Sequence, residues 1–165
     1  AAAQRAKSYA AFGRHADVVP LANEALRQWR KTPPSQARLL NWTLSILCDA
    51  HRNMGQFVEA LRVGDELLGR LRRSMTEDRQ TVVVLNNFAF SFKCLGLPER
   101  AISVHKEALV LAWRVLPPGD ELVATCMYGL AYCHSLVGQH INAEPLLKKA
   151  LAIFQAAQPP NDSMI

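Results

Sequence analysis

The sequence lacks the features that mark membrane-spanning, secreted or disulfide-stabilised proteins. No apolar run approaches the roughly 18 residues that a membrane-spanning helix needs. The first residues, AAAQRAKSYA, do not place a basic stretch before an apolar one, so they do not resemble a secretory signal. The cysteines show no paired spacing, and we interpret them as packing residues of a protein in a reducing compartment: Cys48, Cys94, Cys126 and Cys133. We therefore predict a cytoplasmic protein without a membrane partner.

Recognisable catalytic, nucleotide-binding and metal-binding motifs are also missing. The glycines are isolated rather than clustered in a phosphate-binding loop, and neither a nucleophile elbow nor a zinc signature occurs. Cys133 and His134 are adjacent and would point about 100° apart on a helix, so they are poorly placed to share an ion with Cys126. No acid/base pair or activated nucleophile can be assigned. We predict a protein that is not an enzyme, with no catalytic residue, no metal site and no cofactor.

The excess of basic over acidic residues is small, with a net charge of +5 and an isoelectric point near 9.3. The densest basic cluster is Arg62, Arg70, Arg72, Arg73 and Arg79. Acidic residues lie among these arginines and no aromatic side chains are interleaved with them, unlike a typical nucleic-acid site. We predict that this cluster is a solvated edge and that the protein has no nucleic-acid partner.

What the sequence does contain is a helical hairpin, which is clearest between Leu85 and Leu109. Apolar and small residues recur at positions i, i+3, i+4 and i+7 from Leu85, which predicts a helix with one apolar face. Gly96 and Pro98 then predict the end of that helix and the start of another with the same period. Two helices joined by so short a connection must lie antiparallel.

This hairpin recurs along the chain. The predicted turn glycines Gly13, Gly55, Gly96 and Gly138 are 42, 41 and 42 residues apart. Small residues that would allow close helix packing follow at fixed distances, among them Ala60, Ala101 and Ala143, and then Ala108 and Ala150. His51 and His134 share one repeat position with Tyr9 and Phe92, which indicates an aromatic packing position. A fixed period of this length predicts an all-α solenoid in which each repeat packs on its neighbours.

These repeats resemble the tetratricopeptide repeat family. The resemblance rests on the first-helix pairs Leu47-Cys48, Phe88-Ala89 and Leu130-Ala131, the turn glycines and the small residues of each second helix. The repeat is longer than the usual 34 or so residues, and Leu85-Asn86-Asn87-Phe88-Ala89 is similar to the LNNLA opening of the kinesin light chain subclass. The linker at residues 116–124 is similar to the aspartate-bearing segment between repeats of that subclass. The resemblance implies an α-α superhelix of about four antiparallel hairpins.

We predict that residues 1–165 form a single array of these repeats. The repeats cover approximately residues 1–35, 36–77, 78–119 and 120–158, and residues 159–165 match the register of a linker. The start resembles a helix entered part-way and no polar capping helix follows the last repeat, so we expect an excerpt of a longer protein. Pro20 and Pro145 lie seven residues after their glycines, which predicts second helices that begin late or bend.

The resemblance also implies which residues face a binding groove, because the first helices of such arrays line the concave side. Aromatic side chains would supply anchor pockets, and asparagines could bracket a peptide backbone as donor and acceptor together. Arginine and lysine would favour an acidic ligand. The predicted groove residues are Trp42, Ser45, Asp49, Arg52, Asn86, Asn87, Phe90, Lys93, Tyr128 and Tyr132.

We therefore predict a non-catalytic protein–protein interaction module, or scaffold, that binds a peptide segment of a partner in this groove. The likeness to kinesin light chains implies an acidic segment around an aromatic anchor. Another subclass of the family clamps a C-terminal carboxylate, but Ser45 and Asp49 stand where that clamp would need Lys, Asn or Arg. Two alternatives remain open, namely a self-associating homodimeric spacer and a regulatory or sensory segment of a larger multidomain protein.

Overall fold

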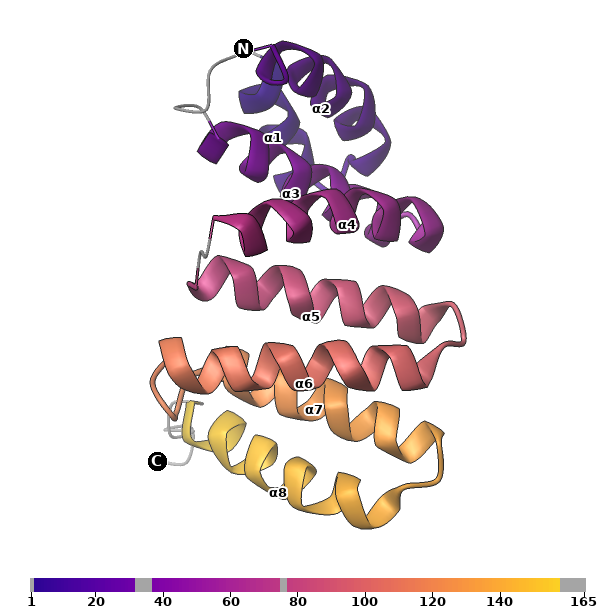
Figure 1. Cartoon of the computed structure of the whole chain (residues 1–165), viewed down its shortest axis with the longest axis vertical. Helices are drawn as coiled ribbons and strands as arrows, with labels where there is room; N and C mark the ends of the chain where they lie inside the picture. Colours follow the sequence, from indigo (N-terminus) through magenta and orange to yellow (C-terminus); the bar gives the residue numbers. More distant parts are fainter. Residues whose placement is uncertain (1, 32–36, 75–76, 158–165) are drawn as a thin grey trace, which may run out of the picture. The chain divides into compact units, whose positions relative to one another are not determined.

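The computed structural model describes residues 2–31, 37–74 and 77–157, and these residues form helices and no strand (Figure 1). The helices are α1 (Ala2–Ala11), α2 (His15–Trp29), α3 (Ala37–Asn53), α4 (Phe57–Arg73), α5 (Arg79–Cys94), α6 (Pro98–Val115), α7 (Glu121–Leu136) and α8 (His140–Ala157). Consecutive helices pair as hairpins: α1 with α2, α3 with α4, α5 with α6, and α7 with α8. The prediction of an all-α fold built from four antiparallel hairpins is confirmed.

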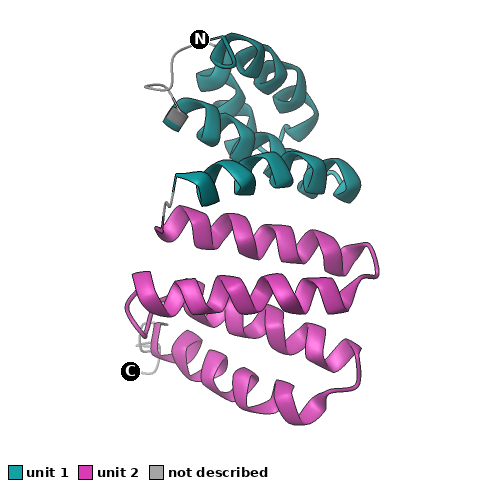
Figure 2. Cartoon of the chain, in the orientation of Figure 1, with its two compact units in different colours: residues 1–76 teal, residues 77–165 magenta. Residues whose placement is uncertain are grey.

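The hairpins group into two compact units, residues 1–76 and residues 77–165 (Figure 2). In the first unit α2 also packs on α3, and in the second α6 packs on α7, so each hairpin covers the next within its unit. That all four hairpins form one continuous array stays a prediction. The predicted linker-like tail at residues 159–165 lies outside the described residues.

The predicted glycine turns are confirmed by their backbone conformation. The φ angles lie between 69° and 74°, in the left-handed region that residues with a Cβ rarely adopt, at Gly13, Gly55, Gly96 and Gly138. The amide N–H of the residue after each glycine donates to a carbonyl five residues earlier, as from Gln56 to His51 at 2.9 Å. This bond is the mark of a Schellman motif, which satisfies the free carbonyls at the end of a helix.

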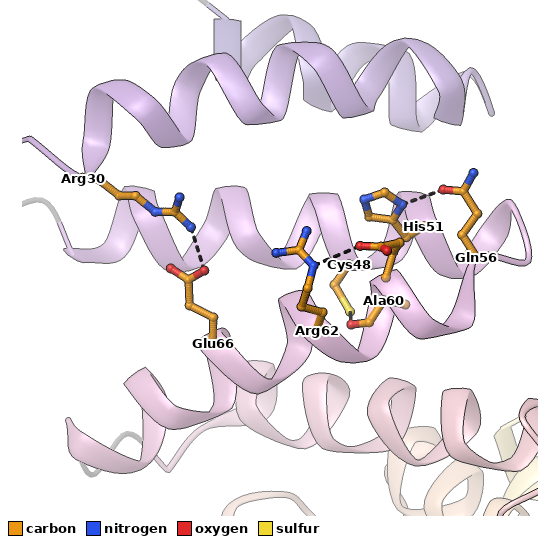
Figure 3. A network of polar contacts seen from close by, with 8 residues as sticks. Arg30, Cys48, His51, Gln56, Ala60, Arg62 and Glu66 are labelled. Atoms are coloured by element: carbon orange, nitrogen blue, oxygen red, sulfur yellow. Dashed lines mark hydrogen bonds and ion pairs between the residues drawn. The ribbon is translucent and has the colours of Figure 1, made fainter.

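The histidines at the repeated aromatic position belong to these turns. Nδ1 of His51 lies 2.7 Å from Oε1 of Gln56 (Figure 3). In the second unit, Nδ1 of His134 lies 2.6 Å from Oε1 of Gln139. Both histidines are buried, as is Phe92 at the equivalent position. A Schellman motif usually has an apolar contact between the residue at the end of the helix and the residue five positions later. In two repeats the histidine–glutamine hydrogen bond replaces this contact. The predicted packing role of both histidines is confirmed.

Two helix starts carry aspartate caps in the second unit. Asp78 accepts a hydrogen bond from the Thr81 amide at 2.8 Å, and Asp120 accepts one from the Leu122 amide at 2.8 Å. Each bond satisfies one of the backbone donors that the first turn of a helix leaves unpaired. Asp78 and Asp120 therefore mark the starts of the first helices of the two hairpins in this unit.

Of the two expected effects of Pro20 and Pro145, a late helix start is wrong, and a bend at the proline stays a prediction. Helix α2 begins at His15 and α8 at His140, so each proline lies inside its helix. A proline removes one hydrogen bond to the carbonyl four residues before it, here that of Ala16 or of Ile141. Both of these residues are exposed, so water can hydrogen-bond the freed carbonyl and the helix continues.

The core follows the predicted small residues. The five repeat alanines of the second helices are at most 2% exposed: Ala60, Ala101, Ala108, Ala143 and Ala150. Three cysteines are buried, but Cys94 is exposed, so its predicted packing role is wrong. It occupies the last turn of α5, on a side that no described helix covers. None of the described helices is long and apolar enough to cross a membrane.

Candidate functional site

The second unit brings four of the predicted groove residues together on α5 and α7, which contact each other. We call Phe90, Lys93, Tyr128 and Tyr132 the aromatic–lysine cluster. Nζ of Lys93 lies 4.0 Å from the ring centre of Phe90 on its own helix and 4.8 Å from that of Tyr132 on α7. An ammonium held against aromatic faces is stabilised by about 0.5–1 kcal/mol at an exposed site. The lysine charge is therefore held between two helices rather than free in solvent.

The tyrosines extend this cluster along α7. The ring centres of Tyr128 and Tyr132 are 6.3 Å apart, and the ring planes are inclined by 40°. Tyr128 is 51% exposed and Tyr132 is 43% exposed, which is high for side chains of this size in a folded protein. Together with Lys93 they form an exposed surface that offers both aromatic faces and a positive charge.

Asn86 and Asn87 lie earlier on α5 and are both half-buried. Oδ1 of Asn86 is buried and has no hydrogen-bond partner among the described residues. A buried acceptor without a partner costs about 1–3 kcal/mol. If the Asn86 side chain rotated slightly, a hydrogen-bond donor of a ligand could reach Oδ1, and the new hydrogen bond would remove this cost.

The other four predicted residues lie on α3, in the first unit. Trp42 and Ser45 are half-buried there. Nη2 of Arg52 lies 3.7 Å from Oδ1 of Asp49, which is an ion pair too long to be a hydrogen bond. The structure therefore gathers the ten predicted residues into two sets, one on α3 and one on α5 and α7.

A pocket of about 220 Å³ lies beside Asp49 and Arg52, where α1, α2 and α3 meet. Its remaining lining residues are Ala10, His15, Ile46, Ala50 and Asn53. Nδ1 of His15 is buried and has no hydrogen-bond partner among the described residues. Sequence reasoning missed His15, because it is the first residue of a second helix and only the packing of α2 on α3 turns it toward a first-helix surface. The sequence carries no motif that could have identified it.

Two arginines of the basic cluster, Arg62 and Arg79, form ion pairs. In the first unit Arg62 pairs with Glu59 at 2.9 Å, and Arg30, which lies outside the cluster, pairs with Glu66 at 2.7 Å (Figure 3). In the second unit Arg79 bonds to Asp120, the cap of α7, and this contact lowers the pKa of that carboxyl. Paired exposed charges of this kind contribute little binding energy. That the cluster is a solvated edge stays a prediction.

The buried side chains of Cys48, Cys126 and His105 have shifted pKa values, and none of them belongs to the aromatic–lysine cluster or to the pocket lining. Burial raises the pKa of the Cys48 and Cys126 thiols to about 12, which makes them poor nucleophiles. Burial also lowers the pKa of His105 to about 4. Within residues 2–31, 37–74 and 77–157, no group of three or more His, Cys, Asp and Glu side chains could hold a metal ion.

A family model described as tetratricopeptide repeat matches residues 81–156, which lie in the second unit. No curated protein matches the sequence significantly. Among solved structures, BtubC (BKLC) from P. vanneervenii is 23% identical with a TM-score of 0.82, over 97% of this chain and 63% of that chain. A kinesin-light-chain-type protein of Podosopora anserina with nearly identical TPR-like repeats is 19% identical with a TM-score of 0.76, over 95% and 75% of the two chains.

A Rap protein complexed with competence and sporulation factor is 16% identical with a TM-score of 0.75. The match covers 92% of this chain but 42% of the Rap chain. At these identities the likenesses establish the fold. The chain thus spans less than two thirds of BtubC and of the Rap protein.

Proposed function

We propose that this chain, in which residues 81–156 match the tetratricopeptide repeat family model, is a non-catalytic protein–protein interaction module that binds a peptide segment of a partner protein. The aromatic–lysine cluster carries this proposal. Exposed aromatic anchors beside a fixed positive charge are what binding hot spots in protein interfaces use. The Rap protein, which was solved in complex with a competence and sporulation factor, supports the view that this fold accommodates such partners.

The chemistry of the cluster selects a partner segment with an acidic residue next to an aromatic one. Lys93 keeps its ammonium hydrogens for a ligand carboxylate, because an aromatic face engages a cation without accepting conventional hydrogen bonds from all three donors. An aromatic side chain of the ligand would pack on Tyr128 and Tyr132, where offset rings add about 0.5–1.5 kcal/mol to the burial of their area.

Asn86 and Asn87 would read the backbone of the same segment. A peptide N–H that donates to Oδ1 of Asn86 would pair an acceptor that is otherwise buried without a partner. The amide group of Asn87 would supply a donor to a peptide carbonyl. In the first unit we propose that Trp42, Ser45, Asp49 and Arg52 contact a further part of the partner.

A fluorescence anisotropy titration tests the proposal directly. The probe is a fluorescein-labelled peptide with the core Glu-Glu-Trp-Glu-Glu, and the comparison peptides replace either the tryptophan by alanine or the glutamates by glutamines. We expect Lys93→Met to weaken binding of the acidic peptide roughly fivefold to tenfold, which corresponds to about 1–1.4 kcal/mol. Lys106→Met is the matched control, because Lys106 is an exposed lysine on α6, outside the cluster. Equal affinities for the two lysine variants would contradict the proposal.

Self-association is a second candidate, and the surface of α8 favours it. Leu151 is 56% exposed, whereas its repeat equivalents Leu26 and Leu109 are each 3% exposed beneath the next hairpin of their units. A second copy could cover this face as a following hairpin does. Sedimentation velocity at about 5 and 200 µM distinguishes the candidates, since a concentration-independent monomer would remove the homodimer.

A further inference from the structure

The pocket between α1, α2 and α3 has the construction of a small anion site. We propose that it binds the carboxylate of an aspartate or glutamate side chain of a peptide partner, held by Arg52 and His15. The inference rests on the proposed function only for the identity of the partner as a peptide. The pocket belongs entirely to the first unit, so it can be tested apart from the aromatic–lysine cluster.

Two sources of positive charge border the pocket. The Arg52 side chain is 24% exposed, so its guanidinium is less hydrated than that of a surface arginine. His15 is the first residue of α2, where the aligned peptide dipoles place a partial positive charge. A carboxylate that entered the pocket would approach both at once, with Asn53 as a further donor on its wall.

The imidazole of His15 supplies the second observation. Its Nδ1 is buried and has no hydrogen-bond partner within the part of the chain that the structure describes. Buried polar atoms in native proteins are almost always paired, so an exception calls for a bound group or a functional role. Nδ1 is closed to solvent in the structure, so the imidazole ring must first turn toward the pocket. In the tautomer that carries its hydrogen on Nδ1, His15 would then donate to a carboxylate oxygen, and this bond would pair the orphaned atom.

Asp49 affects the affinity of the pocket for an anion but does not itself bind the anion. Its carboxylate repels an incoming anion, but it is 40% exposed and lies 3.7 Å from Arg52, too far for a hydrogen bond. The Arg52 guanidinium is the less exposed of the two charges, so water screens it less than it screens the Asp49 carboxylate. Removal of the Asp49 charge should therefore tighten binding of a carboxylate, whereas it would weaken binding of a cation.

The size of the pocket selects a side chain. Its volume of about 220 Å³ is below the roughly 300–1,000 Å³ of pockets for drug-sized ligands. Ala10, Ile46 and Ala50 provide an apolar wall that suits the methylene groups of an acidic side chain. A short aliphatic stem that ends in a carboxylate matches both parts of the lining.

The test is an NMR titration of the whole chain, labelled with ¹⁵N on the backbone and on histidine. The probe is N-acetyl-glutamate amide, which carries only a side-chain carboxylate. N-acetyl-glutamine amide is the neutral comparison, and N-acetylglycine presents a chain-terminal carboxylate instead. We expect saturable shifts of the His15 imidazole and of the α3 amides with the glutamate probe and none with the glutamine probe.

Variants with opposite expected effects sharpen the result. Arg52→Gln should weaken the glutamate probe at least fivefold, His15→Ala should weaken it severalfold, and Asp49→Asn should tighten it severalfold. Arg62→Gln is the control, because Arg62 is an exposed arginine of the same unit outside the pocket. If Arg52→Gln does not fold, Asp49→Asn still decides the matter.

Three results would overturn the inference. They are the absence of a saturable shift with the glutamate probe, tighter binding of N-acetylglycine, and weaker binding of the glutamate probe to Asp49→Asn than to the wild type. Failure of the anisotropy experiment on the cluster together with success here would remove the peptide site of the second unit and keep the carboxylate pocket.

Discussion

Helices α6 and α7 of the second unit approach each other closely at Gly129, and its substitution by alanine is an informative perturbation of the fold. A Cβ at this position on α7 would lie 2.4 Å from Cε1 of His105 on α6, and 2.8 and 3.0 Å from its two ring nitrogens. The ring cannot swing into solvent without opening the contact between the helices, because His105 is 2% exposed.

The expected loss of stability follows from two opposing effects. Carbon atoms pack best at about 3.5–4.0 Å, so a contact at 2.4 Å forces the helices or the ring to move. Overpacking of this kind costs typically about 1–3 kcal/mol, and the short distance indicates the upper end. Alanine regains about 1 kcal/mol over glycine inside a helix. We expect Gly129→Ala to lower the free energy of unfolding by about 2 kcal/mol.

Urea unfolding followed by circular dichroism at 222 nm measures this change. For a slope of about 2 kcal/mol/M, the midpoint should fall by roughly 1 M. Gly69→Ala is the matched control, because the added Cβ would meet only Nη1 of Arg73 at 3.8 Å. We expect that control to stabilise the protein by about 0.5–1 kcal/mol.

The double variant isolates the steric contact from other effects of the substitution. In a His105→Ala background the ring is absent, so Gly129→Ala should stabilise the protein as Gly69→Ala does. A Gly129→Ala protein as stable as the wild type, or an equal loss in the His105→Ala background, would refute the reasoning.

Three further predictions concern titration, capping and thiol reactivity. The pKa of His105 is lowered from 6.5 to about 4, so the unfolded chain binds more protons between these values, and stability should fall by up to about 3 kcal/mol as the pH drops from 6.5 to 4. Urea midpoints across this range should show a loss that is largely absent in His105→Gln. Asp78→Ala removes the cap of α5 and should cost about 1 kcal/mol, measured in the same urea assay; an unchanged midpoint would contradict that role. Cys94 is exposed, whereas burial raises the pKa of Cys48 and Cys126 to about 12. A thiol reagent at pH 8 should therefore modify one cysteine rapidly, and Cys94→Ser should abolish this fast phase.

The helices and turns were predictable because they depend on local chemistry. A glycine at each turn is required by a positive φ angle, and this requirement does not depend on distant residues. Asp78 and Asp120 cap helices through bonds to amides two or three residues away, so their roles also follow from the nearby sequence. Pro20 was misjudged, since the survival of a helix around a proline depends on whether the freed carbonyl faces water.

The register of the repeats predicted which residues lie on the first helices, but it could not predict which of their side chains contact each other. That Lys93 lies between Phe90 and Tyr132 depends on the distance between α5 and α7, which is set by the packing of α6 against both of these helices. The close approach of His105 to Gly129 has the same origin.

By itself, then, the sequence determined the helical hairpins, their period, the turn conformations and the small residues of the core, because each follows from propensity or from spacing along one helix. Tertiary structure alone decided which side chains meet across helices. It assembled the aromatic–lysine cluster from two hairpins and placed His15 and Arg52 in the lining of one pocket where α1, α2 and α3 meet. Contacts between repeats depend on side-chain size and on the distance between helix axes, and neither is encoded in the repeat pattern.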